Sequence, residues 1–399
     1  MHAPTRPHPS RGTILLLGSL TAFGALTIDL YLPALPAIGT DFGVGPAATQ
    51  RTLVAFFIGV ALGQLFYGPI SDRVGRRPPL LFGVALYIVA SLACTFATSI
   101  EALIAGRFVQ ALGCCSGMVI ARSVVRDRFD HQDSARIFSL LTLVLAVAPM
   151  IAPTAGGWLV AATNWRWVFG ALALFGVCIG IATWWRLDES RSAETEAKAR
   201  SETPLRAYFD LLRQRRLLGY LLAGALNGAT LFAYVASAPD LIINIWGLRP
   251  TLFGLVFAIM AVGIIGSSQV NRQLLLRYSA DRILGVALVY GIATGGLLVA
   301  ASLLHAGPWT IFALLFATLS SSGFIGSNAL AGALSVDPLR SGSTSGLAGA
   351  SSFGAGAGAA ALSGAFHDGT ALPLAVVMLL SLSGAAAAYF GLAHRPEPA

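Results

Sequence analysis

Two charged side chains, Asp29 and Arg107, lie inside apolar stretches that are long enough to cross a bilayer as helices. A charge inside a membrane is costly, so such a residue normally faces a cavity or a partner and serves transport. At helical rise, Asp29 lies roughly 13 Å and Arg107 roughly 8 Å from the outer ends of their stretches. The similar depth predicts that they interact directly or through water. An ion pair that only fixes helix packing is the alternative.

Pro33 strengthens the functional interpretation of Asp29. Proline lacks the N–H that would bond the carbonyl four residues earlier, so the helix is expected to open at Asp29 itself. Opened backbone is tolerated in a membrane only where protein or water satisfies it. The sequence therefore predicts that Asp29 borders a cavity and carries a proton.

A short charged turn joins two further apolar stretches, 52–70 and 79–98. Basic residues are common in cytoplasmic loops, which explains the arginines but not their ordered spacing with glycine and aspartate. A cluster of opposite charges between two helix ends could hold one conformation and release another. We expect an electrostatic gate on the cytoplasmic side, formed by Gly68, Asp72, Arg73, Gly75, Arg76 and Arg77, with Asp127 as their partner.

The stretch 137–160 contains Pro149, Pro153, Gly156 and Gly157. Two prolines remove helix hydrogen bonds, and two adjacent glycines allow another backbone to approach closely. The pattern predicts a bent helix with one tightly packed face.

Other polar residues inside apolar stretches could line a substrate cavity, or could equally hydrogen-bond between helices. They are Tyr31, Gln110, Asn227, Tyr234 and Asn328. His305 and His367 fall at the outer ends of stretches, where a solvated surface position is expected rather than a proton relay. The four cysteines fall in apolar runs without metal-ligand spacing, so neither a disulfide framework nor a metal site is predicted.

The chain has 399 residues, of which 56% are hydrophobic and 11% charged. So few charges cannot cover the surface of a soluble body of this size. The sequence predicts an all-α membrane protein with two six-helix halves around a central cavity. Its twelve predicted spans are 13–38, 52–70, 79–98, 102–121, 137–160, 167–185, 217–238, 251–270, 283–303, 309–333, 344–366 and 371–393.

Basic residues set the expected orientation. Of the 26 Lys and Arg residues, 22 fall in loops on the N-terminal side, whereas Arg51, Arg166 and Arg249 fall on the other side. Both termini are therefore expected in the cytoplasm. The net charge of +8 reflects this topology, and no nucleic-acid partner is predicted.

A polar interruption divides the spans six and six. The predicted parts are a tail (1–12), a half (13–186), a linker (187–216), a second half (217–393) and a tail (394–399). The linker is expected to be flexible up to Ser201 and then to form a short amphipathic helix on the inner leaflet, starting near Pro204. In the eleventh span, Gly342, Gly346, Gly354 and Gly358 predict a closely packed helix.

The charged turn resembles the signature between the second and third spans of the major facilitator superfamily. The segment Pro149–Gly157 resembles the signature of its proton-antiporting exporters. Asp29–Pro36, Gly106–Gly113 and Val125–Asp127 are similar to motifs of the bicyclomycin/chloramphenicol-resistance (Bcr/CflA) drug:proton antiporters. This resemblance implies alternating access, with Asp29 and Arg107 as the coupling pair and Asp72, Arg73 and Asp127 in the gate.

The expected function is therefore proton-coupled export of hydrophobic or amphiphilic drugs, such as amphenicol- or bicyclomycin-like compounds, by a monomer in a bacterial inner membrane. The alternatives are an exporter of sugars or nucleosides on the same fold and a membrane sensor that does not transport. No phosphate loop or nucleophile triad is present in the sequence, so neither an enzyme nor an ATP-driven pump is expected, and the proton gradient replaces a cofactor.

Overall fold

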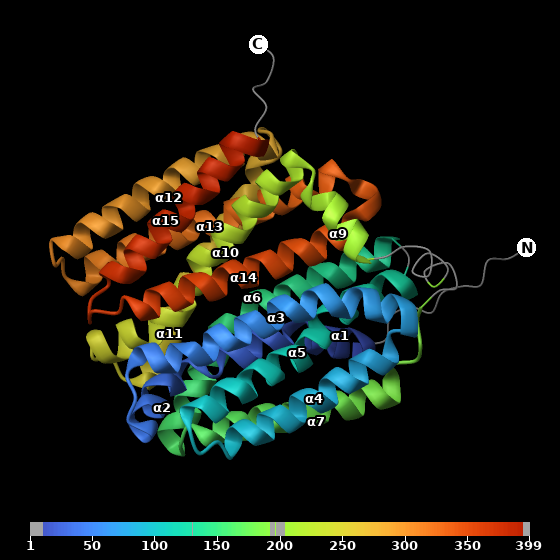
Figure 1. Cartoon of the computed structure of the whole chain (residues 1–399), viewed down its shortest axis with the longest axis horizontal. Coiled ribbons are helices and arrows are strands. Elements are labelled where there is room, and N and C mark those ends of the chain that lie inside the picture. Colours follow the sequence, from blue (N-terminus) through green and yellow to red (C-terminus); the bar gives the residue numbers. More distant parts are fainter. Residues whose placement is uncertain (1–10, 130, 192–195, 197–203, 394–399) are drawn as a thin grey trace, which may run out of the picture.

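A computed structural model describes residues 11–129, 131–191, 196 and 204–393. The predicted tail 394–399, most of the tail 1–12 and most of the segment 192–203 lie outside the described residues. The described residues form helices joined by short loops (Figure 1).

The first half contains α1 (Arg11–Asp29), η1 (Leu32–Ala34), α2 (Leu35–Phe42), α3 (Pro46–Val74), α4 (Arg77–Thr95), α5 (Ile100–Arg128), α6 (His131–Ala162) and α7 (Arg166–Arg186). After α9 (Pro204–Leu212), the second half contains α10 (Arg215–Pro239), η2 (Asp240–Ile245), α11 (Pro250–Leu274), α12 (Ala280–Leu303), α13 (Pro308–Val336), η3 (Pro338–Arg340), α14 (Ser341–Ala365), α15 (Leu372–Ala388) and η4 (Tyr389–Ala393).

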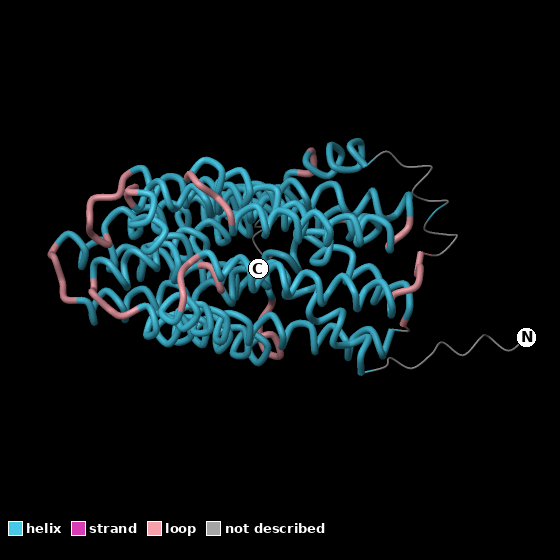
Figure 2. The backbone as a smooth tube through the Cα atoms, turned by 90° about the horizontal axis from the view of Figure 1, so that it is seen from below, coloured by secondary structure: helices cyan, strands magenta, loops and turns pink. Residues whose placement is uncertain are grey.

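Eleven helical segments of the described chain are long and apolar enough to cross a membrane. The twelfth, α14, has 25 residues rich in Gly, Ala and Ser and is not among these eleven. Figure 2 shows the long helices running side by side in one direction, with loops gathered at the two ends. The predicted all-α, twelve-helix fold is confirmed.

The two halves meet along two pairs of helices, α3 with α14 and α6 with α11 (Figure 1). Glycines make the second contact close, because a Cβ at Gly157 would overlap the carbonyl oxygen of Pro250 and one at Gly254 would overlap Thr154. A glycine of each helix therefore packs directly against the other helix, as small residues commonly do between membrane helices.

Helix α14 is closely packed, but not through the glycines that the sequence suggested. A Cβ at Gly342, Gly354 or Gly358 would meet no atom within 4 Å, and one at Gly346 would make only ordinary contacts. The prediction of these packing positions is wrong. The glycines that α14 needs are Gly349, Gly356 and Gly364, which lie against Gln64, Phe232 and Gln50 respectively.

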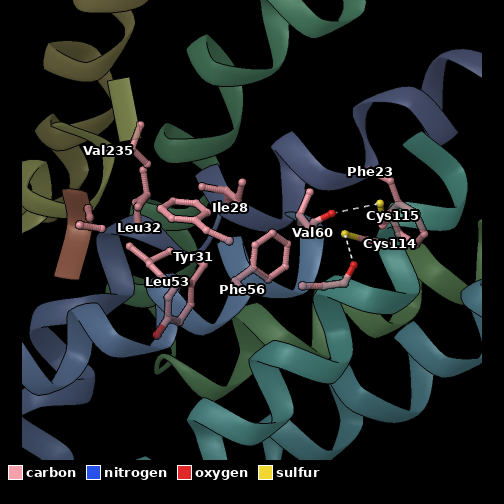
Figure 3. Packing of buried hydrophobic residues seen from close by; sticks show 14 of the residues in the cluster. Phe23, Ile28, Tyr31, Leu32, Leu53, Phe56, Val60, Cys114, Cys115 and Val235 are labelled. Carbon is pink, nitrogen blue, oxygen red and sulfur yellow. Dashed lines mark hydrogen bonds between the residues drawn. The ribbon is translucent and has the colours of Figure 1, made fainter. Parts of the chain in front are cut away.

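The first membrane helix is broken where the sequence predicted. Helix α1 ends at Asp29, and the chain resumes as the 3₁₀ turn η1, which contains Pro33, before α2 begins at Leu35. Proline cannot donate a helix hydrogen bond, so the chain winds more tightly at this point. The break contacts the second half, where Leu32 lies beside Val235 of α10 (Figure 3).

Helix α9 starts at Pro204 and contacts both halves. The Tyr208 hydroxyl donates to the carbonyl oxygen of Leu65 in α3 at 3.2 Å, while Asp210 pairs with Arg340 before α14 at 3.4 Å. Leu211 is buried, whereas Phe209 and Leu212 are exposed. The helix thus ties the two halves together and leaves apolar side chains on its outer face.

Candidate transport and gating sites

Arg107 is fully buried in the first half, between aromatic rings. Its guanidinium carbon lies 4.3 Å from the ring centroids of both Tyr31 and Phe56, two residues that Figure 3 shows in the packed core. Its Nη1 donates to Gln110 Oε1 at 2.6 Å and to the Thr27 carbonyl oxygen at 3.4 Å. Its Nε and Nη2 are buried without a hydrogen-bond partner in the described structure. The cation is held by π-faces rather than by a carboxylate.

Asp29 is also buried, at 5% exposure, but the structure does not pair it with Arg107. Among the described residues, no hydrogen bond or ion pair is formed by its carboxylate. Thr27 and Tyr31 contact Arg107 from one face of the chain, and residue 29 falls between them on the opposite face. The predicted interaction between the two charges is therefore not formed in the described structure.

The smaller polar residues of this region position Arg107. Gln110 donates to Ser91 Oγ at 2.7 Å, and the Tyr31 hydroxyl bonds to Thr52 at 2.7 Å. Both side chains are fully buried within the first half. The structure therefore places Tyr31 and Gln110 around the guanidinium, where both make hydrogen bonds between helices.

In the second half, the three predicted cavity residues Asn328, Asn227 and Tyr234 differ in whether their polar atoms are hydrogen-bonded. Asn328 Nδ2 donates to Asn271 Oδ1 at 2.8 Å, so it joins α13 to α11. Asn227 Oδ1 and the Tyr234 hydroxyl are buried and have no partner in the described chain. An unpaired buried polar atom is costly, so these two remain the candidates for contact with a substrate or water.

The glycine pair of α6 connects the broken first helix to the second half. A Cβ at Gly156 would overlap the Leu30 carbonyl oxygen and lie 3.1 Å from Pro33, whereas Gly157 faces Pro250 of α11. Pro153 and Pro149 lie in the same helix, about one and two turns earlier respectively. Helix α6 therefore contacts the backbone next to Asp29 on one side and the opposite half on the other.

The charged turn folds around one buried cation, Arg76, which is 2% exposed. Its Nε donates to Asp127 Oδ2 at 2.7 Å, and its Nη1 donates to Ser71 Oγ at 2.8 Å and to Asp72. Burial lowers the pKa of Arg76, but the two carboxylates outweigh burial and raise the pKa above its ordinary value. The structure thus brings together three of the residues predicted for the gate, Asp72, Arg76 and Asp127.

Sequence reasoning missed a fourth member, Glu189. Its carboxylate accepts hydrogen bonds from the backbone N–H groups of Arg76, Arg77, Ser190 and Arg191, at 2.9 to 3.1 Å. Burial raises the pKa of Glu189, but these four donors outweigh burial and hold the pKa below its ordinary value. The expected flexibility of the linker is therefore wrong at Glu189, which caps the turn.

Gly75 explains why the turn needs glycine. Its φ is +99°, a conformation that side chains rarely adopt, and a Cβ there would lie 2.5 Å from Glu189 Oε2. At Gly68, by contrast, no close contact requires a glycine, because a Cβ there would meet no atom within 4 Å.

The other two arginines of the turn, Arg73 and Arg77, form hydrogen bonds with the linker and with α7. The Arg73 carbonyl oxygen accepts from Arg191, and Arg77 Nη2 donates to the Trp184 carbonyl oxygen at 2.8 Å.

One acidic residue of the second half also escaped the sequence analysis. Asp240 is the first residue of η2, directly after α10, and is 9% exposed; its carboxylate Oδ2 forms a hydrogen bond with His367 Nε2 at 2.6 Å. The expectation that His367 is simply solvated is wrong. The two residues are 127 positions apart, so only the folded chain shows the pair.

The fold and these motifs define a membrane transporter with two helical halves. The chain belongs to the Major Facilitator Superfamily, whose sequence pattern matches residues 15–361. It is 31% identical over 380 residues, covering 94% of each chain, to the uncharacterized MFS-type transporter YdgK of Bacillus subtilis. It is 30% identical over 382 residues, covering 96% of each chain, to the bicyclomycin resistance protein homolog of Haemophilus influenzae. It is 31% identical over 234 residues, 59% of each chain, to the multidrug resistance protein MdtL of Escherichia coli.

Solved transporters share the fold. The xylose transporter XylE from E. coli, in a partially occluded inward open conformation, superposes with a TM-score of 0.73 at 10% identity, covering 95% of this chain and 97% of that one. An inward-facing, occupied bacterial homolog of the human lysosomal transporter Spinster gives a TM-score of 0.69 at 16% identity, covering 94% and 95%.

Proposed function

We propose that the protein exports hydrophobic or amphiphilic compounds, amphenicol- or bicyclomycin-like antibiotics among them, in exchange for protons. It acts as a monomer in the bacterial inner membrane with both termini in the cytoplasm, and the proton gradient is its only energy source. The names of the Haemophilus and Escherichia relatives support a drug substrate. The observation that carries the proton-coupling part is Asp29, a buried carboxyl group without a protein partner at a break in a membrane helix.

In the proposed cycle, Asp29 carries the proton. A buried carboxyl group that no cation neutralises takes up a proton readily and releases it when a competing ligand or water reaches it. Arg107 holds the chain on both sides of Asp29 through the Thr27 carbonyl and the Tyr31 ring. Gly156 of α6 contacts the backbone at Leu30. A change of charge at Asp29 therefore acts on α5 and α6 through α1, and α6 passes the shift to the second half.

The junction of the halves supports an apolar substrate. Phe232 of α10 lies with its ring centroid 4.6 Å from both Phe57 of α3 and Phe353 of α14. These rings offer stacking surfaces on both halves, while the unpaired atoms of Asn227 and Tyr234 offer a few polar contacts on α10. Such a combination suits an amphiphile better than a sugar, which needs many hydrogen-bond partners.

The first test is a growth-inhibition panel of chemically diverse antibiotics, with cells that express the chain compared with cells that carry the vector alone. We expect higher tolerance to at least one hydrophobic compound and lower accumulation of it, both abolished by a protonophore. Tolerance that survives the protonophore would contradict proton coupling.

The second test measures drug-induced proton release from detergent-solubilised protein across a pH series. Wild type is expected to release protons, whereas Asp29→Asn should not, since the amide cannot titrate. Glu101→Gln, which alters an exposed carboxylate at the start of α5, is the matched control and should release protons as wild type does. Unchanged release by Asp29→Asn would place the proton on another group.

A further inference from the structure

A cavity of about 200 Å³ lies between the two halves, at the end of the molecule where α2 and η2 contact each other. The first half contributes Thr40, Thr49 and Gln50 to its wall, and the second half contributes Asp240 and Asn244. The cavity is separate from Arg107, which does not line it.

Asp240 gives the cavity its charge, since it is the one charged residue among those that line it. Its Oδ1 accepts from Asn244 Nδ2 at 2.8 Å, and its Oδ2 bonds to His367 Nε2 at 2.6 Å. Each carboxylate oxygen has two lone pairs, so each retains a site for a further donor. The neighbours orient the carboxylate without saturating it.

The other polar groups add hydrogen-bond acceptors. The Thr40 hydroxyl donates to the Pro36 carbonyl at 3.2 Å and the Thr49 hydroxyl donates to the Pro46 carbonyl at 2.9 Å, so the lone pairs of both oxygens remain. Gln50 lines the cavity as well, but its Oε1 is buried against Gly364 of α14, so the two threonine hydroxyls are the acceptors that the first half adds.

We propose that this cavity, formed by Thr40, Thr49, Gln50, Asp240 and Asn244, binds the ammonium head of a protonated amine. A negative carboxylate surrounded by acceptors matches a cation with several N–H donors, and such charge-assisted hydrogen bonds are the strong ones. The volume holds a small alkylammonium group rather than a whole drug-sized molecule. Because both halves line the site, an amine bound there contacts both of them. The proposal does not depend on drug export or on Asp29.

The test is calorimetric titration of the purified full-length protein in detergent with n-butylammonium at neutral pH. We expect wild type to bind n-butylammonium, and to bind n-butanol and n-butyltrimethylammonium at least about tenfold more weakly, since these lack the charge or the N–H donors. Asp240→Asn keeps the side-chain shape and should weaken n-butylammonium binding by about tenfold or more.

Two further variants separate binding from folding. Asp41→Asn is the matched control, because Asp41 is an acidic residue of α2 that pairs with Arg166 and Trp165 and does not line the cavity. It should bind n-butylammonium as wild type does. His367→Ala removes a competing partner of Asp240 and should bind n-butylammonium equally or more tightly. Equal binding by Asp240→Asn and wild type, or loss of binding in His367→Ala, would overturn the proposal.

Discussion

The charged ends of the two halves are built differently. In the first half, Arg76 is buried between Asp72 and Asp127, and Glu189 caps the turn that presents it. In the second half, the acceptor is Asp281 at the start of α12. Its carboxylate accepts a hydrogen bond from the Tyr220 hydroxyl at 2.6 Å, and its backbone carbonyl oxygen accepts one from the Tyr389 hydroxyl at 2.9 Å. Arg216 Nη2 lies 3.9 Å from the carboxylate.

The difference supports the proposal that the charged end of the first half acts as a gate. A buried cation shared by two carboxylates from different helices becomes strongly unfavourable when a partner leaves, because an uncompensated charge is then buried. Such a network has two discrete states, which suits a gate. The second cluster uses neutral hydroxyl donors and an ion pair in which both side chains are more than 40% exposed. It joins α10, α12 and η4 and has no buried charge to release.

The largest expected effect follows from removing the cation of the first cluster. Arg76→Ala leaves Asp127 without its partner in a largely buried position, which we expect to cost about 3 kcal/mol. The apparent melting temperature in detergent should fall by roughly 5–10 °C. Drug efflux from cells, if the proposed function holds, should also fall. Thermal unfolding of the purified variant measures the first quantity.

Arg216→Ala is the matched variant in the second half. Its exposed ion pair contributes at most about 1 kcal/mol, so the melting temperature should fall by no more than roughly 3 °C. Equal losses of melting temperature in the two variants would remove the contrast between the clusters.

A smaller effect on stability, but a clear one on transport, is expected for Asp72→Asn. The Asp72 side chain is 41% exposed, so its loss leaves Arg76 paired with Asp127 and the protein folded. The gate loses one of its two carboxylates, and efflux should fall several-fold while expression stays largely intact. Efflux is compared at equal membrane abundance. Wild-type efflux by this variant would contradict the assignment of Asp72 to the gate.

The smallest effect on stability is expected for Glu189, which caps the charged turn, and this effect depends on pH. Because the pKa of Glu189 is below its ordinary value of 4.5, the ionised carboxylate stabilises the fold above that value and loses this contribution as pH falls through the lowered pKa. Glu189→Gln should therefore melt below wild type at pH 7. The difference in the free energy of unfolding between the two proteins is expected to stay under about 1 kcal/mol, because Glu189 is an exposed residue.

Melting curves of wild type and Glu189→Gln between pH 7 and pH 4 test this expectation. The two curves should converge only toward the acidic end of the series. Asp188→Asn, which alters a neighbouring carboxylate that is 92% exposed, should follow wild type throughout. A Glu189→Gln difference that is the same at every pH would mean that shape, not charge, matters at this position.

The membrane helices and their breaks could be predicted from the sequence, because both follow from local chemistry. A long apolar run must satisfy its own backbone hydrogen bonds in lipid, so it forms a helix wherever it occurs. Pro33 removes one particular N–H, so it interrupts the helix next to Asp29 whatever surrounds it. The ordered charges of the turn likewise indicated the cluster that Arg76 forms with Asp72 and Asp127.

The tertiary structure alone decided which side chains meet across long distances in sequence. The rotation of α1 and of the turn that follows it brings Thr27 and Tyr31, not Asp29, into contact with Arg107. The pairing of Asp240 with His367 and the capping by Glu189 depend on how helices far apart in the sequence are placed together. Hydropathy sets how deep a residue lies in the membrane, whereas the packing of neighbouring helices sets which way it faces.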